Sequence, residues 1–177
     1  MTEPGGKQVT DTEIAERILA LGAPTMEERH AAISALRAIG LPAIGPLLKA
    51  LAEARENDLR WYAAVALSRI GEPAVGPLIE AMRSNKAPEF RRYGAAALGE
   101  VGAPAVELLI AALKSEDPEF RGFLSQALCR IGGPAVEPLR NRLHDADDII
   151  RSCATLTLWK MGEAGVPVIV EDAEKEN

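Results

Sequence analysis

The sequence of 177 residues contains only two cysteines and two histidines, so metal and disulfide chemistry have few residues to use. Cys129 and Cys153 do not form a closely spaced zinc pair, and two thiols provide no disulfide framework, which suits a reducing compartment. Neither His30 nor His144 is followed by glutamate. We therefore expect no metal site and no cofactor.

Long apolar runs are missing as well. No stretch approaches the roughly 18 apolar residues of a membrane span, and the N-terminal sequence MTEPGGKQVTDTE lacks the apolar region of a secretory signal. The chain has 26 acidic and 20 basic side chains, a net charge of −6, which disfavours neutralisation of nucleic-acid phosphates. These features predict a soluble cytoplasmic protein that binds neither a membrane nor nucleic acid.

Catalytic motifs are also lacking. The sequence has no Cys-x-x-Cys, no Gly-x-Gly-x-x-Gly and no Walker-type loop. Its carboxylates gather at expected helix starts, for example Asp58, Glu89 and Glu119, where capping and the helix dipole account for them. Free cysteines in alanine-rich helices usually behave as small buried hydrophobes. No catalytic residue is assigned, and we expect the protein not to be an enzyme.

What the chain does have is a repeated phrase, Gly-x-Pro-Ala. Its glycines are Gly40, Gly71, Gly102 and Gly132, with a weaker copy at Gly162, and the intervals are 31, 31, 30 and 30 residues. A constant period of this length is the signature of stacked supersecondary units. Apolar residues recur at helical spacing on both sides of each phrase. Each unit is therefore predicted to be a pair of helices.

The phrase is predicted to be a tight corner. Its glycine would be the left-handed residue that ends one helix, and its proline would lie in the first turn of the next, where a missing N–H costs nothing. Capping patterns at Thr10, Thr25 and Asp117 mark further helix starts. The predicted helices cover residues 11–21, 25–39, 42–53, 58–70, 73–84, 88–101, 104–114, 118–131, 134–144, 147–161 and 166–171.

The stretch DPEFRGFLSQALCRIGGPAVEPL, from Asp117 to Leu139, resembles the HEAT-like repeat named after phycobilisome lyases. That pattern is Asp-Pro-x-apolar-Arg, an alanine-rich helix, and then apolar-Gly-x-Pro-Ala. The resemblance covers about residues 25–165 and implies an all-α fold, a right-handed α-solenoid of about five stacked helix hairpins. We expect one repeat domain over residues 10–171, preceded by a disordered segment 1–9 and followed by an acidic tail 172–177.

The resemblance leaves several functions open, because the family includes bilin attachment and chaperoning, scaffolding, and iron-dependent hydroxylation. The hydroxylases use His-Glu pairs as iron ligands, which this sequence lacks. The favoured hypothesis is a non-enzymatic interaction or scaffold module that binds an unidentified protein partner on the concave face, as a monomer or homodimer. The alternative is a bilin lyase or chaperone-type relative acting on phycobiliproteins. Nucleic-acid binding is less favoured, because the second helices carry a surplus of only two basic residues.

One position in the second helix of each unit is always arginine. The row consists of Arg29, Arg60, Arg91, Arg121 and Arg151. It could bind anions, but the position lies beside the apolar stripe of the helix. We therefore predict a structural role, in which the stems pack and each guanidinium bridges to an acid or carbonyl of an adjacent unit.

The opposite face of the second helices would line the concave surface, where solenoids bind partners. It is poor in charge, and Trp61 is the best anchor, because aromatic residues dominate interface energetics. The predicted partner-binding residues are Trp61, Val65, Arg92, Ala96 and Gln126, edged by Tyr62, Tyr93 and Phe123, which alternatively fill space between units. Gly99 and Gly122 would leave room for a ligand or partner, and the last helix could cover Trp159.

Overall fold

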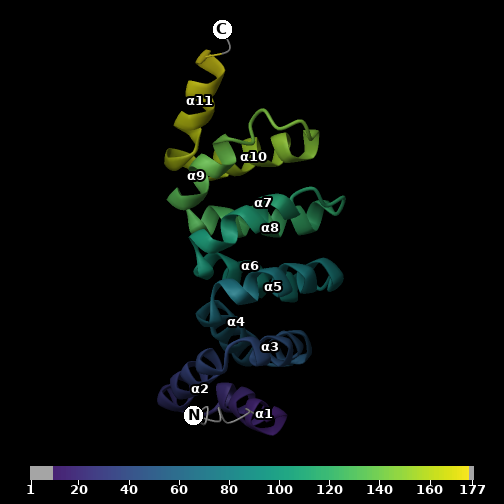
Figure 1. The fold of residues 1–177 in the computed structure, drawn as a ribbon, viewed down its shortest axis with the longest axis vertical. Coiled ribbons are helices and arrows are strands. Elements are labelled where there is room, and N and C mark those ends of the chain that lie inside the picture. The colour runs from purple at the N-terminus through teal and green to yellow at the C-terminus, as the bar shows by residue number, and fades with distance from the viewer. Residues whose placement is uncertain (1–9, 176–177) are drawn as a thin grey trace, which may run out of the picture. The chain divides into compact units, whose positions relative to one another are not determined.

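The structure is a computed structural model that describes residues 10–175, and within this range it consists of helices and short connections without any strand. The chain divides into two compact units between Ile70 and Gly71. Figure 1 labels the helices of both units. The predicted disorder of residues 1–9 lies outside the described residues, and the single domain over residues 10–171 stays a prediction.

The first unit contains four helices. They are α1 (Asp11–Leu19), which continues into a 3-10 turn (Ala20–Gly22), α2 (Met26–Ile39), α3 (Leu41–Glu53) and α4 (Asn57–Ile70). Helix α1 packs on α3 and α2 packs on α4, so the unit has two layers (Figure 1). Leu36, Leu47, Leu51 and Leu67 are completely buried between them. This core places the outward faces of α2 and α4 side by side.

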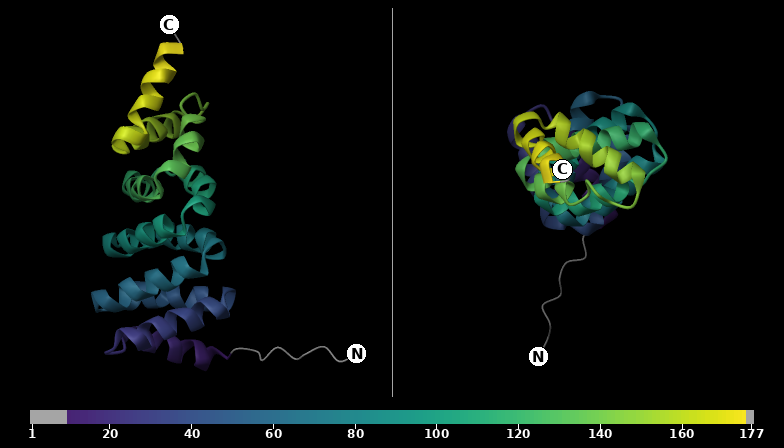
Figure 2. Two further views of the ribbon diagram at one scale, coloured as in Figure 1. Left: turned by 90° about the vertical axis from the view of Figure 1, so that its left-hand side faces the viewer. Right: turned by 90° about the horizontal axis from the view of Figure 1, so that it is seen from above.

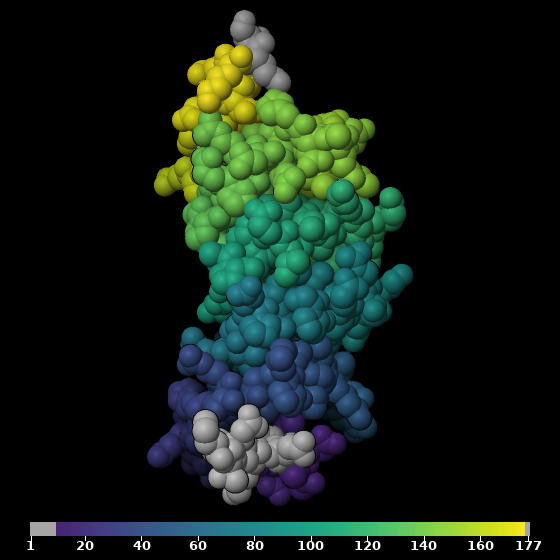
Figure 3. Space-filling view, viewed as in Figure 1, coloured from purple at the N-terminus to yellow at the C-terminus, as the bar shows by residue number. Residues whose placement is uncertain are grey.

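The second unit contains seven helices and two 3-10 turns. They are α5 (Glu72–Ser84), α6 (Pro88–Val101), a turn (Ala103–Ala105), α7 (Val106–Ala112), α8 (Pro118–Ile131), α9 (Gly133–Arg140), α10 (Asp148–Lys160), a turn (Gly162–Ala164) and α11 (Val166–Lys175). Helices α5, α7 and α9 form one layer, and α6, α8 and α10 form the other (Figure 2). Side chains fill the spaces between neighbouring ribbons (Figure 3). The predicted all-α fold of stacked helix pairs is confirmed.

Two helix ends differ from the sequence-based expectation. Helix α9 ends at Arg140, and the chain continues in turns closed by short-range bonds such as Leu143 N–H to Arg140 O at 3.0 Å. Helix α11 continues to Lys175, so most of the segment expected to be an acidic tail is helical. Two of its acidic side chains contact α9 and the turn after it: Glu171 lies 3.2 Å from Arg140, and Asp172 lies 2.8 Å from His144.

The predicted caps are present at three helix starts. The Thr10 hydroxyl accepts a hydrogen bond from the Glu13 N–H at 3.2 Å. Thr25 and Glu28 form a complete capping box, in which each side chain accepts from the backbone N–H of the other. The Asp117 carboxylate accepts from the Phe120 N–H at 3.1 Å. Polar side chains in these positions therefore fix where the helices begin.

The corner glycines have positive φ, as predicted, but a different ψ. Gly40, Gly102 and Gly132 have φ of 72°, 81° and 72° with ψ of −129°, −143° and −133°. These values lie in a region accessible almost only to glycine, not in the left-handed helical region that the sequence suggested. At the first corner the Gly40 N–H donates to Leu36 O, and Gly40 O accepts from the Ala43 N–H, both at 3.0 Å. One residue therefore ends one helix and begins the next.

Candidate functional site

The arginine row closes the loop that precedes each second helix. Arg29, Arg91, Arg121 and Arg151 each donate a hydrogen bond to the carbonyl oxygen six residues earlier in the chain, at 2.5 to 3.2 Å. Arg60 departs from the pattern and reaches the Asn57 side chain at 3.5 Å. The carbonyl acceptors therefore lie in the arginine's own repeat. Four of the five guanidinium groups are occupied in this way. The predicted bridge to an acid of an adjacent repeat is made by Arg29 to Asp58 at 3.6 Å and by Arg91 to Asp117 at 2.7 Å.

Arg91 is the most deeply engaged member of the row. It is completely buried, its Nε donates to Met82 O at 3.0 Å, and its Nη2 donates to Asp117 Oδ2 at 2.7 Å. The guanidinium also lies over the ring of Phe120, with its carbon 5.4 Å from the ring centroid. Asp117 is the N-cap of α8, so Arg91 joins α6 to the start of the following second helix.

This contact predicts a pH effect. The hydrogen bond from Arg91, followed by the Phe120 N–H, lowers the pKa of Asp117 from 3.8 to about 2. Because the folded-state pKa is the lower one, the stabilisation is fully present above pH 4 and is lost as the pH falls from about 4 to 2. We expect the difference in unfolding free energy between the wild type and Asp117→Asn to shrink through that window. Urea unfolding at several pH values measures it, and a difference independent of pH would contradict the assignment.

The first unit has an open groove between α2 and α4, called here the α2–α4 groove, with a volume of about 380 Å³. Helix α2 contributes Met26, His30, Ile33, Ser34 and Arg37. Helix α4 contributes Trp61, Tyr62, Val65 and Arg69. Three of the predicted partner-binding residues, Trp61, Tyr62 and Val65, thus lie together, and Trp61 is 44% exposed. No carboxylate lines this groove.

The aromatic end of the α2–α4 groove is held by contacts between the two helices. The Tyr62 hydroxyl donates to Met26 Sδ at 3.1 Å. The Arg29 guanidinium lies over the Tyr62 ring, 4.8 Å from its centroid, and approaches the Asp58 carboxylate to 3.6 Å. Tyr62 therefore packs between repeats and also lines the groove, so the two roles considered for it coexist.

The remaining predicted partner-binding residues lie in the second unit, on α6 and α8, outside the α2–α4 groove. They are Arg92, Tyr93, Ala96, Phe123 and Gln126. The Arg92 guanidinium lies over the ring of its neighbour Tyr93 at 5.2 Å. Gln126 is exposed, whereas Tyr93, Ala96 and Phe123 are partly buried. The structure thus brings together the first three residues of the predicted set and leaves these five apart from them.

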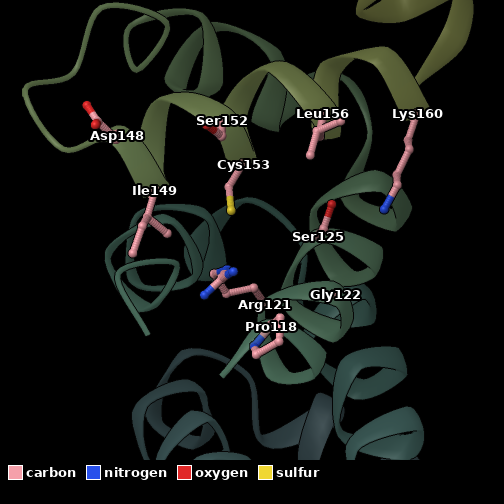
Figure 4. Close-up of a pocket in the computed structure, with 10 residues that line it drawn as sticks. All are labelled: Pro118, Arg121, Gly122, Ser125, Asp148, Ile149, Ser152, Cys153, Leu156 and Lys160. Atoms are coloured by element: carbon pink, nitrogen blue, oxygen red, sulfur yellow. The ribbon is translucent and has the colours of Figure 1, made fainter. Parts of the chain in front are cut away.

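A second groove, called here the α8–α10 groove, opens in the second unit with a volume of about 470 Å³ (Figure 4). Helix α8 provides Pro118, Arg121, Gly122 and Ser125. Helix α10 provides Asp148, Ile149, Ser152, Cys153, Leu156 and Lys160. Most of these residues were not predicted as site residues. One sequence signal pointed to this groove, namely Gly122, which was expected to leave room for a ligand or partner. The space is open at this position, since a Cβ there would meet no atom within 4 Å.

Two expectations about the second helices are wrong. A Cβ on Gly99 would lie 2.5 Å from Cδ of Arg130, so an arginine of α8 already fills the space that the sequence assigned to a ligand. Trp159 is 65% exposed, although α11 was expected as a possible cover. Helix α11 does pack on α10, but against another face of that helix than the one that carries Trp159.

Two glycines inside second helices should respond oppositely to alanine. A Cβ on Gly94 would lie 2.6 Å from Sδ of the buried Met82, so Gly94→Ala should lower the unfolding free energy by about 1 kcal/mol. Gly122→Ala meets no atom and should raise it by up to about 1 kcal/mol through helix propensity. Urea unfolding of the two variants tests this. Changes of equal sign would contradict the packing described for Gly94.

The described residues offer little chemistry besides these grooves. Within residues 10–175, no three His, Cys, Asp or Glu side chains are grouped to hold a metal ion. Burial raises the pKa of both the Cys129 and the Cys153 thiol. No single described helix is long and apolar enough to cross a bilayer; α6 and the segment 103–112 together pass by length and composition, but across a 118° bend.

Comparison with known proteins identifies the class. The family model for HEAT repeats matches residues 75–159, and the model for the PBS lyase HEAT-like repeat matches residues 28–53 and 59–84. The chain is therefore a HEAT-like repeat protein of the PBS lyase type, as the sequence resemblance predicted. A comparison with curated proteins finds no match.

Several solved structures are similar to the chain. One is a chain of the complex of CpcE and CpcF of phycocyanin lyase from Nostoc sp. PCC7120, with 24% identity, a TM-score of 0.41, and coverage of 93% of this chain and 89% of that chain. Another is a designed armadillo repeat protein in complex with the peptide (KR)4, with 18% identity, a TM-score of 0.34, and coverage of 90% and 91%.

Proposed function

We propose that this chain is a non-enzymatic interaction module that binds a segment of a partner protein along its second helices. The observation that carries the proposal is the α2–α4 groove, in which a half-exposed tryptophan stands beside a tyrosine, a methionine and two arginines. Tryptophan, tyrosine and arginine are the residues most enriched among interface hot spots. Because Tyr62 is fixed by Met26 and Arg29, little side-chain freedom remains to be lost when a partner binds.

The chemistry of the described residues supports binding over turnover. A thiol whose pKa is raised by burial stays protonated at neutral pH and is a poor nucleophile, and this holds for Cys129 and Cys153. Asp117 and Asp147 serve as helix caps. Four of the five arginines of the arginine row are bonded to loop carbonyls. The accessible side chains of the α2–α4 groove, such as Trp61 and the two arginines, are suited to contact with a partner.

Replacing Trp61 by alanine should weaken capture of the partner at least about tenfold, because it removes the largest exposed anchor of the groove. The measurement is affinity capture from the source organism with quantitative mass spectrometry. Trp159→Ala is the matched control, since Trp159 is also exposed but lies outside the groove residues. Equal recovery of every partner by the wild type and Trp61→Ala would refute this site.

A bilin lyase or chaperone-type role is the second candidate, favoured by the match of two segments to the PBS lyase HEAT-like repeat. The protein would then act on a phycobiliprotein subunit and its pigment. Mixing the chain with bilin and a phycobiliprotein subunit tests this role through the absorption spectrum. A spectrum that equals the sum of its components would remove this candidate and leave the interaction module.

A further inference from the structure

The α2–α4 groove has an apolar end and a basic end. Met26, 54% exposed, and Trp61 lie near the N-terminal ends of the two helices. Arg37 and Arg69 lie in their last turns, and both are exposed. Within residues 10–175, no carboxylate lies within ion-pair distance of either arginine. The two positive charges are therefore available to a ligand.

In the second unit, a carboxylate neutralises the arginine at one position equivalent to Arg69. Arg69 and Arg130 both stand two residues before a corner glycine. Arg130 donates two hydrogen bonds to Glu100, at 2.6 and 3.0 Å, and Glu100 holds the equivalent position one repeat earlier. One repeat before Arg69 that position is Ala38, and its neighbour is Arg37. The carboxylate found between α6 and α8 thus has no counterpart between α2 and α4.

The spacing along the helices sets the shape of a matching ligand. Residues 26 and 37 are separated by about 16 Å along α2, and residues 61 and 69 by about 12 Å along α4, at 1.5 Å per residue. An extended chain covers about 12 Å in four residues, and a helix covers it in eight. A protein segment can therefore place one side chain at Trp61 and another at the arginines.

Resting on the proposed function, we propose that the α2–α4 groove binds an acidic segment of a partner protein. A bulky apolar side chain of the segment contacts Trp61 and Met26, and one or two carboxylates further along it pair with Arg37 and Arg69. These ion pairs reproduce, between two proteins, the Arg130–Glu100 contact that the second unit makes internally. The apolar contact supplies affinity, and the charges supply orientation and selectivity.

A nucleic acid fits this groove less well. Two arginines neutralise few phosphates, and the chain as a whole has a net charge of −6. The first turns of α2 and α4, next to the apolar end, carry Glu27, Glu28 and Asp58, which would repel a continuing phosphate backbone. A protein segment with only one or two carboxylates needs no more than the two arginines to neutralise it. With its apolar part at Trp61, it also keeps those carboxylates away from the acidic first turns.

The test is selection of random peptides of about twelve residues on the full chain. We expect enrichment of peptides that combine Asp or Glu with a bulky apolar residue. Their affinity should fall at least about tenfold for Arg37→Gln/Arg69→Gln. It should also fall for Ala38→Glu, which places a carboxylate beside Arg69 as Glu100 lies beside Arg130. The charge-matched control is Arg17→Gln/Arg55→Gln, exposed arginines outside the groove, and should stay within about twofold of wild type.

Fluorescence locates the bound peptide, because the chain has only two tryptophans. In Trp159→Phe the single remaining tryptophan is Trp61, and its emission should shift to the blue when a selected peptide free of tryptophan and tyrosine binds. In Trp61→Phe the same peptide should leave the emission of Trp159 unchanged. These two variants separate binding in the groove from binding elsewhere on the chain.

The outcomes distinguish the inference from the proposed function. Selected peptides that are neutral or basic, that bind Ala38→Glu as tightly as wild type, or that shift only Trp159 overturn the acidic-segment site and leave an interaction module. An oligothymidylate of about twelve nucleotides that shifts Trp61 and displaces the peptides also overturns it, in favour of a phosphate ligand. Failure to select any peptide counts against both the inference and the proposed function.

Discussion

Replacing Arg91 by alanine should lower the free energy of unfolding by about 3 kcal/mol, near the lower end of the range for removing one partner of a buried ion pair. The substitution leaves the carbonyl oxygens of Met82 and Asn85 without their donor, and it removes the stem packed in the core. The Asp117 side chain is 30% exposed, so water compensates part of its loss. Urea unfolding measures the effect when it is followed by the fluorescence of Trp159, the tryptophan of the second unit.

The neighbouring Arg92→Ala is the matched control. It removes the same charge from the same turn of α6, but Arg92 is exposed and its contact in the structure is the ring of Tyr93. Its loss should change the unfolding free energy by less than about 1 kcal/mol. Similar losses for both variants would show that charge alone matters, and that the bonds from Arg91 to the loop carbonyls contribute little.

The second large effect is expected at a corner. Gly132→Ala should lower the free energy of unfolding by about 2 kcal/mol, because φ of 72° with ψ of −133° is strained for any residue with a Cβ. No atom lies within 4 Å of the added methyl group, so the effect would come from the backbone alone.

The adjacent Gly133 separates this backbone effect from a general loss of glycine. Its φ is not positive, and a Cβ there would also meet no atom within 4 Å. Gly133→Ala should therefore be neutral or slightly stabilising at the first position of α9. The midpoints of thermal unfolding of the two variants, measured in the same buffer, give the comparison. A loss at Gly133 equal to that at Gly132 would contradict the role given to the corner.

The fold was predictable because its signals are local. A glycine that tolerates positive φ, a proline in the next first turn and a capping threonine or aspartate each act within a few residues. The sequence is therefore enough to place the helix ends that carry these signals, whereas the ends of α9 and α11 carry none of them. The ψ of the corner was not predictable in the same way. It depends on the direction in which the next helix must leave, and packing between whole helices sets that direction.

The site was predictable only in part, for a related reason. Trp61 was singled out because a tryptophan on the helix face opposite the apolar stripe is conspicuous in the sequence. Which gaps between second helices stay open depends on the side chain that fills each one. Arg130 fills the space over Gly99 between α6 and α8, whereas the equivalent Lys160 lines the open α8–α10 groove. Both residues are long basic side chains at the same position of the repeat, so the pattern does not separate them. What holds Arg130 over Gly99 is its contact with Glu100, 30 residues earlier.

The interactions that join one repeat to the next have a further consequence for how the chain acquires its structure. The contacts Tyr62–Met26, Arg91–Asp117, Ser125–Thr157 and Arg130–Glu100 connect residues 36, 26, 32 and 30 positions apart. None of these four contacts joins residues from distant parts of the sequence. Closing short loops loses little entropy, so the chain should fold rapidly, one hairpin serving as the template for its neighbour.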